Sequence, residues 1–143
     1  MKVFKKKDLP WSEIAHELVG AEHGLEVTLL FVEAPPGRGP ALHRHPYAEL
    51  FIVLDGAARF TVNNQQIDVR AGEIIVAEAD EPHAFVNTGA GVLRQIDIHL
   101  SPSFSTEWLD ATGGARKRAD GGRARDDVTL AGSAPDVPAV GSD

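Results

Sequence analysis

The sequence predicts an all-β protein, a jelly-roll β-barrel made of two facing antiparallel sheets. Short segments rich in β-branched and aromatic residues recur between residues 49 and 100, as expected of a sandwich or barrel. Turns containing glycine, asparagine or proline separate these segments. A length of 143 residues with 43% apolar composition suits one domain with one core. Short helical or turn segments are expected at both ends of the barrel.

The N-terminal segment, residues 1–24, is expected to lie outside the barrel domain proper. Within it, residues 11–19 (WSEIAHELV) are predicted to form a short helix or turn, with Ser12 as N-cap. His16 in this stretch and His23 in the turn that follows are interpreted as surface histidines, because histidine is often exposed.

The predicted domain extends over residues 25–110 and contains a series of strands. They are expected at residues 25–32, 49–54, 57–62, 65–69, 74–78, 83–87 and 92–100. Asp55-Gly56 and Asn63-Asn64 are typical of tight hairpin turns. A final turn or helix is expected to dock on the barrel through Phe104, Trp108 and Leu109. Residues 111–143 contain no aromatic residue and are predicted to be a disordered tail.

One short stretch carries the residues that best predict a metal site. His43 and His45 alternate with Arg44, so on a strand both imidazoles point to one face. Glu49 follows a proline-containing bend that can turn its carboxylate back to the same point. His83 opens a later strand behind a proline. The chain has no cysteine, so a metal ion must be held by nitrogen and oxygen.

These residues resemble the two sequence motifs of the cupin superfamily. The first motif is matched at every fixed position, by Gly37, His43, His45, Glu49 and Gly56. The second is matched by Gly72, His83 and Asn87, with Glu78 where the family usually has proline and Asp80 where it has glycine. Aspartate tolerates left-handed backbone conformations, so the turn at Asp80 is expected to form. The resemblance covers about residues 25–100.

The resemblance implies a double-stranded β-helix in a small single-domain cupin (a monocupin) that binds metal. It implies one divalent transition metal ion, Fe, Mn, Ni, Co, Cu or Zn, held by His43, His45, Glu49 and His83. Cupins with this ligand set include dioxygenases, isomerases, lyases, cyclases and non-catalytic binders, so the fold does not name the reaction.

Side-chain alternation predicts the walls of the barrel cavity. Phe51, Val53 and Phe85 are expected to line it. On the last strand Gln95, Asp97 and His99 share one face, whereas Arg94, Ile96, Ile98 and Leu100 share the other. If the polar face points inward, Gln95 and His99 line the pocket and support the site or contact substrate. We favour the outward orientation, because an apolar face belongs against a core.

The expected function is that of a metal-dependent cupin enzyme acting on a small organic molecule in the cavity. A dioxygenase or an isomerase, lyase or cyclase is expected, because an open metal position beside an apolar cavity suits catalysis. The alternative is a non-catalytic metal-containing binder or sensor. Glu49, as a base, and Tyr47 are the catalytic candidates. Arg44, Tyr47 and Glu78 lie near enough in sequence to orient an anionic or phenolic substrate.

Composition limits the partners. A net charge of −7 argues against nucleic acid, which needs a basic surface. No stretch approaches the ~20 apolar residues of a membrane span, and no apolar segment follows the N-terminal lysines, so a cytoplasmic protein without membrane contact is expected. Residues 50–54 are apolar on both faces, which predicts a homodimer.

Overall fold

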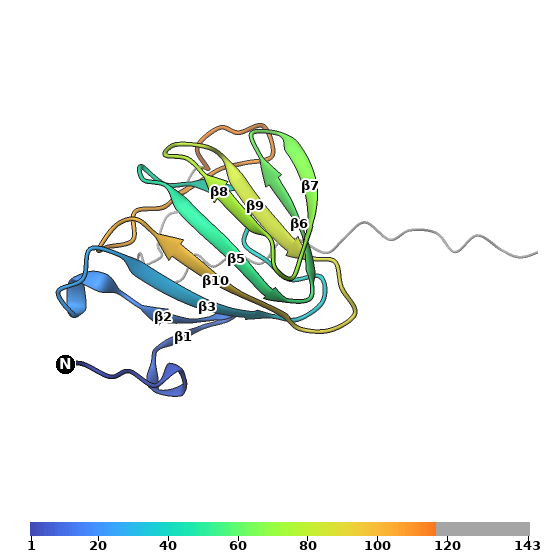
Figure 1. The fold of residues 1–143 in the computed structure, drawn as a ribbon. Helices are drawn as coiled ribbons and strands as arrows, with labels where there is room; N and C mark the ends of the chain where they lie inside the picture. Colours follow the sequence, from blue (N-terminus) through green and yellow to red (C-terminus); the bar gives the residue numbers. More distant parts are fainter. Residues whose placement is uncertain (117–143) are drawn as a thin grey trace, which may run out of the picture.

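Two antiparallel β-sheets face each other in the computed structural model, which describes residues 1–116 (Figure 1). One sheet has six strands in the order β1-β2-β3-β10-β5-β8, and the other has five in the order β11-β4-β9-β6-β7. The strands are β1 (Trp11–Ser12), β2 (Ala15–Leu18), β3 (Thr28–Ala34), β4 (His43–Arg44), β5 (Glu49–Asp55), β6 (Ala57–Val62), β7 (Gln65–Arg70), β8 (Ile74–Ala77), β9 (His83–Asn87), β10 (Leu93–His99) and β11 (Glu107–Trp108). This architecture confirms the predicted jelly-roll class.

The hairpins follow the predicted turn signals. Between β6 and β7, Asn63 and Asn64 adopt φ angles of 48° and 64°, and Val62 pairs with Gln65. A two-residue turn with both central φ values positive matches the twist of the flanking strands, and asparagine tolerates this conformation. Gly56, with φ of 90°, makes the turn between β5 and β6.

The N-terminal segment differs from the prediction, because residues 11–19, expected to form a short helix or turn, contain a β-hairpin. Ser12 pairs with Ala15 across a turn in which Glu13 has φ of 49°. Residues Ala15–Leu18 then pair with β3. Pairing satisfies the backbone groups at the open edge of β3, a long-range gain that outweighs local helix propensity. The remaining helical structure there is two short 3-10 turns, η1 (Lys6–Asp8) and η2 (Gly20–Glu22).

The C-terminal segment also contributes a strand where a turn or helix was expected. In β11, Glu107 pairs with Arg44 and Trp108 with His43. This pairing covers the edge of β4, the short strand that carries His43, the first of the predicted metal ligands. The segment is therefore part of the framework around the predicted site.

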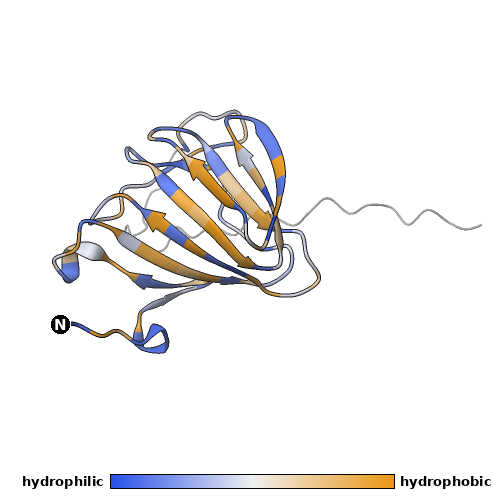
Figure 2. Ribbon diagram, viewed as in Figure 1, coloured by the Kyte–Doolittle hydropathy of each residue, from blue (hydrophilic) through white to orange (hydrophobic). Residues whose placement is uncertain are grey.

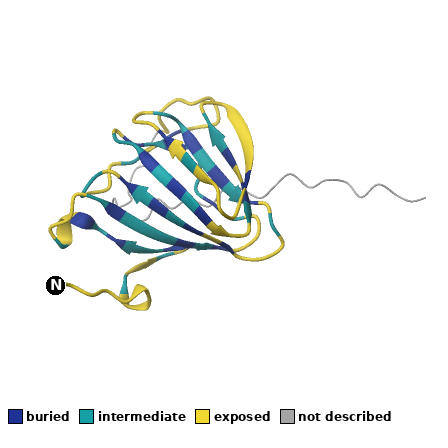
Figure 3. Cartoon of the chain, in the orientation of Figure 1, coloured by how far each residue is buried: buried dark blue, intermediate teal, exposed yellow. Residues whose placement is uncertain are grey.

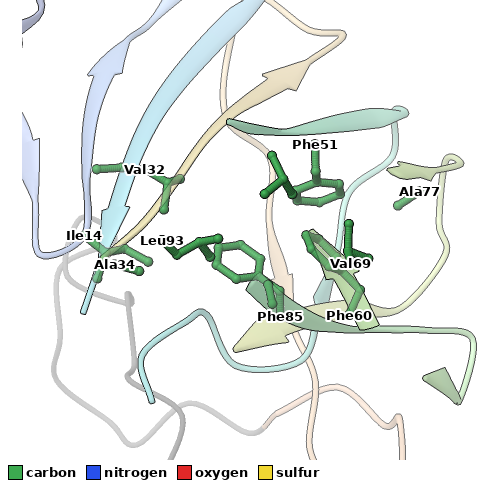
Figure 4. Packing of buried hydrophobic residues seen from close by; sticks show 12 residues of the cluster. Ile14, Val32, Ala34, Phe51, Phe60, Val69, Ala77, Phe85 and Leu93 are labelled. Carbon is green, nitrogen blue, oxygen red and sulfur yellow. The ribbon is translucent and has the colours of Figure 1, made fainter. Parts of the chain in front are cut away.

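An aromatic cluster joins the two sheets (Figure 4). Phe51 comes from the six-stranded sheet, and its ring centroid lies 5.0 Å from that of Phe60 in the other sheet. Phe85 lies 5.3 Å from Phe60. The ring of Phe51 is also 5.6 Å from that of His83, so the apolar core directly adjoins the predicted ligands.

The polar face of β10 points into the barrel, so the favoured outward orientation is wrong. Alternate residues along the strand are buried (Figure 3): Leu93, Gln95, Asp97 and His99. The register with β5 requires this, because these side chains lie beside the inward side chains of β5. The pairs are Gln95 with Val53, Asp97 with Phe51, and His99 with Glu49.

The chain beyond β11 turns at Asp110. The backbone N–H groups of Thr112 and Gly114 donate to the Asp110 carboxylate at 2.9 and 3.0 Å. The predicted disordered tail lies, from residue 117 onward, outside the described residues. Within the part of the chain that the structure describes, no helix is long and apolar enough to cross a membrane.

Candidate metal centre

The four predicted ligands come together inside the barrel. His43 lies on β4, His45 follows it, Glu49 begins β5 and His83 begins β9. One ligand atom of each residue lies within 4.8 Å of the others, and all four side chains are buried. His43 and His83 are cross-strand neighbours, with ring centroids 4.4 Å apart. The alternation of the H-x-H pair and the pairing of β4 with β9 therefore direct all three imidazoles to one point.

Each of these histidines is oriented through its Nδ1 atom. His43 Nδ1 donates to the carbonyl of Ala41 at 2.7 Å, and His83 Nδ1 donates to the carbonyl of Glu81 at 2.7 Å. His45 Nδ1 donates to the carbonyl of Ser105 at 2.9 Å. A ring whose Nδ1 proton is bound to a carbonyl presents the lone pair of Nε2, which is how ligand histidines are commonly fixed.

The Nε2 atoms face the Glu49 carboxylate at short range. His45 Nε2 and His83 Nε2 each lie 3.0 Å from Glu49 Oε2. Among the described residues, the buried His45 Nε2 has no hydrogen-bond partner of suitable geometry, despite this distance. At this distance an unprotonated Nε2 and the carboxylate oxygen repel each other through their lone pairs. A ring proton or a metal ion between them removes this repulsion. Three imidazole nitrogens and a carboxylate oxygen are suitable donors for a divalent transition metal ion.

The ionisation of the cluster also suits metal binding. Burial lowers the pKa of His43 to about 3, and the neighbouring His83 and His45 contribute to the shift, so this ring is neutral at pH 7. Burial by itself raises the pKa of Glu49. Its contacts with His45, His83 and His99 outweigh burial and hold that pKa well below the usual value. The site thus offers a neutral imidazole and an ionised carboxylate.

A fourth histidine, His99, contacts the other oxygen of Glu49. His99 Nε2 lies 2.9 Å from Glu49 Oε1, and His99 Nδ1 lies 3.0 Å from the hydroxyl of Tyr47. The backbone N–H of Ser105 donates to the same hydroxyl at 3.2 Å. Burial, the largest cause, raises the pKa of Tyr47, which stays protonated at pH 7. Tyr47, a catalytic candidate from the sequence, is therefore bonded to His99 and Ser105.

An open hollow of about 200 Å³ lies beside His45. Arg44 and Glu107 form an ion pair at its rim, with Arg44 Nε 2.7 Å from Glu107 Oε2. The other lining residues are Pro46, Asp80, Ser105 and Thr106. Phe51, Val53 and Phe85 belong to the packed core. Gln95 and His99 face the barrel interior. Contact of these five residues with a substrate stays a prediction.

The turn before His83 keeps its shape despite the two departures from the cupin pattern. Asp80 has φ of 64°, the left-handed conformation expected at a glycine position. Its N–H donates to the carbonyl of His45 at 2.7 Å, which ties the turn to a ligand. The N–H of Glu78 donates to Glu81 Oε2 at 2.8 Å, a bond that the usual proline cannot make. The Glu78 side chain is exposed.

Sequence reasoning missed some of the residues that support the site. The Ala41 and Glu81 carbonyls each lie two residues before the histidine that they accept from, a local signal that was available. The Ser105 carbonyl, 60 residues from His45, had no such signal. Asp97 was assigned to the polar face of β10 but given no role. Burial, then the charge of Glu49, raises its pKa well above the usual value.

Comparisons with known proteins agree with this geometry. A family model described as "Cupin domain" matches residues 30–99. The chain is 30% identical over 79 residues to an oxalate-binding protein of Thermotoga maritima, covering 54% of this chain and 65% of that protein. It is 34% identical over 61 residues to the HTH-type transcriptional regulator PuuR of Escherichia coli, covering 43% of this chain and 33% of the regulator.

A crystal structure supports the same fold assignment. A conserved Klebsiella pneumoniae protein with a double-stranded β-helix domain superposes with a TM-score of 0.63 at 18% identity, covering 75% of this chain and 90% of that one. The match to the regulator spans a third of its length, so that likeness concerns one domain. The family match, the barrel topology and the motif residues lead to one conclusion: the chain belongs to the cupin superfamily, with its cupin domain at residues 30–99.

Proposed function

We propose that the chain binds one divalent transition metal ion through His43, His45, Glu49 and His83. The observation that carries this proposal is the orientation of the three imidazoles. Their Nδ1 atoms are all bonded to backbone carbonyls, so their Nε2 lone pairs converge beside one carboxylate. Fe, Mn, Ni, Co, Cu and Zn all suit this donor set, and Cu(II) is expected to bind most tightly in vitro.

We propose further that the loaded protein is an enzyme for a small carboxylate with adjacent oxygen atoms. When bound, the metal ion would supply Lewis-acid polarisation of a substrate oxygen. The hollow borders His45, and Arg44 and Thr106 in its lining offer donors for an anionic group, beside the carboxylates of Asp80 and Glu107. Sequence similarity to a protein named for binding oxalate supports a carboxylate ligand. Dioxygenase chemistry and isomerase, lyase or cyclase chemistry are the reaction classes proposed.

Three residues of the chain have separate proposed roles around the centre. Arg44 would steer a carboxylate at the rim, although its pairing with Glu107 must loosen for it to do so. Both carboxylate oxygens of Glu49 are already in contact with histidines, so we propose Glu49 as a ligand rather than a mobile base. The short distance between Phe51 and His83 would keep bulk water from the inner side of the centre.

A non-catalytic binder or sensor is the second candidate. The names of the two curated relatives favour it, since one is an oxalate-binding protein and the other a transcriptional regulator. Turnover separates the two proposals, because a binder takes up ligand without forming product.

Elemental mass spectrometry of protein purified without chelators or a histidine tag tests the metal site. We expect stoichiometric metal in the wild type and in His16→Ala, and a metal content near zero in His45→Ala. His16 is the matched control, because its Nδ1 lies 3.2 Å from the Leu9 carbonyl, away from the cluster. Equal loss in both variants would rule out the ligand assignment.

Calorimetric titration with oxalate then tests the ligand class. We expect binding to metal-loaded wild type and none to the metal-free protein. Oxygen uptake and product analysis on the same samples separate a dioxygenase, which consumes oxygen, from a non-redox enzyme, which forms product without doing so. Binding without product in either assay would favour the binder.

We also propose that two copies pair through the outer face of the six-stranded sheet. Register places apolar residues of this face next to one another across β3, β10, β5 and β8: Leu29, Phe31, Ile96, Ile98, Leu50, Ile52, Ile74 and Val76. The ribbon of these strands is hydrophobic over much of its length (Figure 2). None of these apolar residues carries charge, and a twofold axis through this face would bring like surfaces together. The proposed occupant of the face is a second copy of this chain.

A further inference from the structure

We infer that His99, oriented by Tyr47, is a positioning residue that holds Glu49 in the geometry of a metal ligand. The inference rests on the proposed metal site and adds residues outside the four ligands. The two carboxylate oxygens of Glu49 contact different histidines. Oε2 faces His45 and His83, whereas Oε1 lies 2.9 Å from His99 Nε2.

The partners of His99 on its two sides point to the tautomer with the proton on Nε2. His99 Nε2 lies 2.9 Å from Oε1 of the ionised Glu49, and a carboxylate only accepts hydrogen bonds, so this nitrogen is assigned the proton. The partner of His99 Nδ1, at 3.0 Å, is the Tyr47 hydroxyl, which can donate, and not a carbonyl as at the three ligand histidines. The Tyr47 oxygen also accepts from the Ser105 N–H at 3.2 Å, which leaves its own proton for His99 Nδ1.

This tautomer is the opposite of the one adopted by the three ligand histidines. His43, His45 and His83 carry the proton on Nδ1 and present a lone pair at Nε2. His99 presents a proton at Nε2. A protonated nitrogen cannot coordinate a metal ion, so His99 is set up to support the carboxylate and not to bind the ion.

One residue, Ser105, contacts both kinds of histidine system through its backbone. The Ser105 carbonyl accepts from His45 Nδ1 at 2.9 Å, while the Ser105 N–H donates to Tyr47. The neighbouring Phe104 ring packs edge-on against His99, with centroids 5.1 Å apart. The segment before β11 thus orients His45 with its Nε2 lone pair toward Glu49. Through Tyr47 it also supports the tautomer of His99 that carries the proton on Nε2.

Burial makes the support necessary. Glu49 and His99 are each 3% exposed, so water has little access to replace a lost hydrogen bond. Without the donor, the carboxylate is free to rotate and its buried Oε1 is left without a partner. Partners of this kind change metal affinity by about 10–100-fold when they are removed.

The test uses Cu(II) as the probe and compares wild type with His99→Leu, His99→Gln and Tyr47→Phe. In chelator competition we expect His99→Leu to bind Cu(II) about 10–100-fold more weakly. His99→Gln, whose side-chain amide can still donate to Glu49, should recover most of the affinity. Tyr47→Phe should lose less than His99→Leu, and it serves as the second variant if His99→Leu does not fold.

Electron spin echo envelope modulation of the Cu(II)-loaded proteins tests whether His99 is itself a ligand. A general loss of stability in the variant would not change the number of imidazoles that it detects. It detects the distant nitrogen of each coordinated imidazole. We expect the same number of coupled imidazoles in wild type and His99→Leu, with a changed Cu(II) hyperfine splitting in the variant. One imidazole fewer in His99→Leu would make His99 a ligand and overturn the inference.

Two further outcomes are distinguishable. Unchanged Cu(II) affinity in His99→Leu, with His45→Ala still defective, would overturn the positioning role and leave the proposed metal site intact. Wild-type protein that binds no Cu(II), or that binds it as well after His45→Ala, would overturn the site and the inference together.

Discussion

On β10, in the middle of the six-stranded sheet, the two faces reverse the usual arrangement of polar and apolar side chains. On β10 the inner residues Gln95, Asp97 and His99 are buried, whereas the outer residues Ile96 and Ile98 are partly exposed (Figure 3). Antiparallel sheets with one solvated face normally place apolar residues inward and polar residues outward. Here the inner face serves the candidate site.

Hydrogen bonds explain why the inner face tolerates polar groups. The Gln95 amide donates to Asp97 Oδ1 at 2.7 Å, and His99 contacts Glu49. A buried polar group is costly unless it is bonded, and among the described residues the buried Gln95 Oε1 has no hydrogen-bond partner. Polar side chains on β10 therefore occupy buried positions that apolar core residues would otherwise fill.

On the outer face, Arg94 and Glu33 form an ion pair, whereas the apolar residues beyond them lie next to one another without hydrogen-bonding groups. Register places Ile52 next to Ile74 and Ile96, and Leu50 next to Val76 and Ile98. Ile74 is 60% exposed. The buried polar residues around the candidate site and the apolar residues of the outer face therefore predict different losses when each is altered.

The largest effect is expected at β4, where adjacent residues lie on opposite faces. His43→Ala should weaken metal binding more than about 100-fold, because a ligand matters more than the residues that support it. Arg44→Ala should change it by less than about twofold, since its exposed ion pair with Glu107 contributes little. Chelator competition measures both. Similar losses in the two variants would show that the inward and outward sides of β4, in the five-stranded sheet, are not functionally distinct.

The next effect is expected on the outer face. Ile74→Lys should raise the dissociation constant of the proposed dimer at least about 10-fold, because it buries a charge in an apolar interface. The matched control is Ile67→Lys on β7 in the other sheet, where the side chain is 56% exposed. Analytical ultracentrifugation at micromolar protein measures the mass. A wild-type monomer, or equal dissociation in both variants, would exclude this face.

The smallest effect is expected at Asp97. Burial, then the charge of Glu49, raises the pKa of Asp97. The folded protein therefore holds this proton at pH values where the unfolded chain, with a pKa of about 3.9, has released it. Stability from this group is present below the unfolded pKa and is lost as pH rises through the folded pKa. In metal-free protein, Asp97→Asn should thus increase the free energy of unfolding at pH 7.

The same variant should have little effect near about pH 3, where the carboxyl group is largely protonated in both states. Urea unfolding in the presence of a chelator, at both pH values, gives the comparison. The asparagine retains an oxygen that can accept the hydrogen bond from Gln95. Lower stability of Asp97→Asn at pH 7 would mean that the carboxylate is ionised and well bonded in the fold.

Much of the barrel was predictable because turn chemistry and alternation are local. The bounds of β6 and β9 match the prediction, and Asn63-Asn64 forms the expected hairpin turn. The hairpin at residues 11–18 was not predictable from its own pattern, because it forms only against the free edge of β3. The same holds for β11, which needs β4 as a partner.

The sequence by itself determined which residues could meet at the centre: the spacing of His43 and His45, with Glu49 and His83 at motif positions, brings four donor side chains to one place. Only the tertiary structure decided which face of β10 points inward and which backbone carbonyls orient the histidines. The physical reason is the sequence separation of the interacting residues. Alternation is a property of a single strand, whereas orientation depends on pairing and hydrogen bonds between residues far apart in the chain, such as His45 and Ser105.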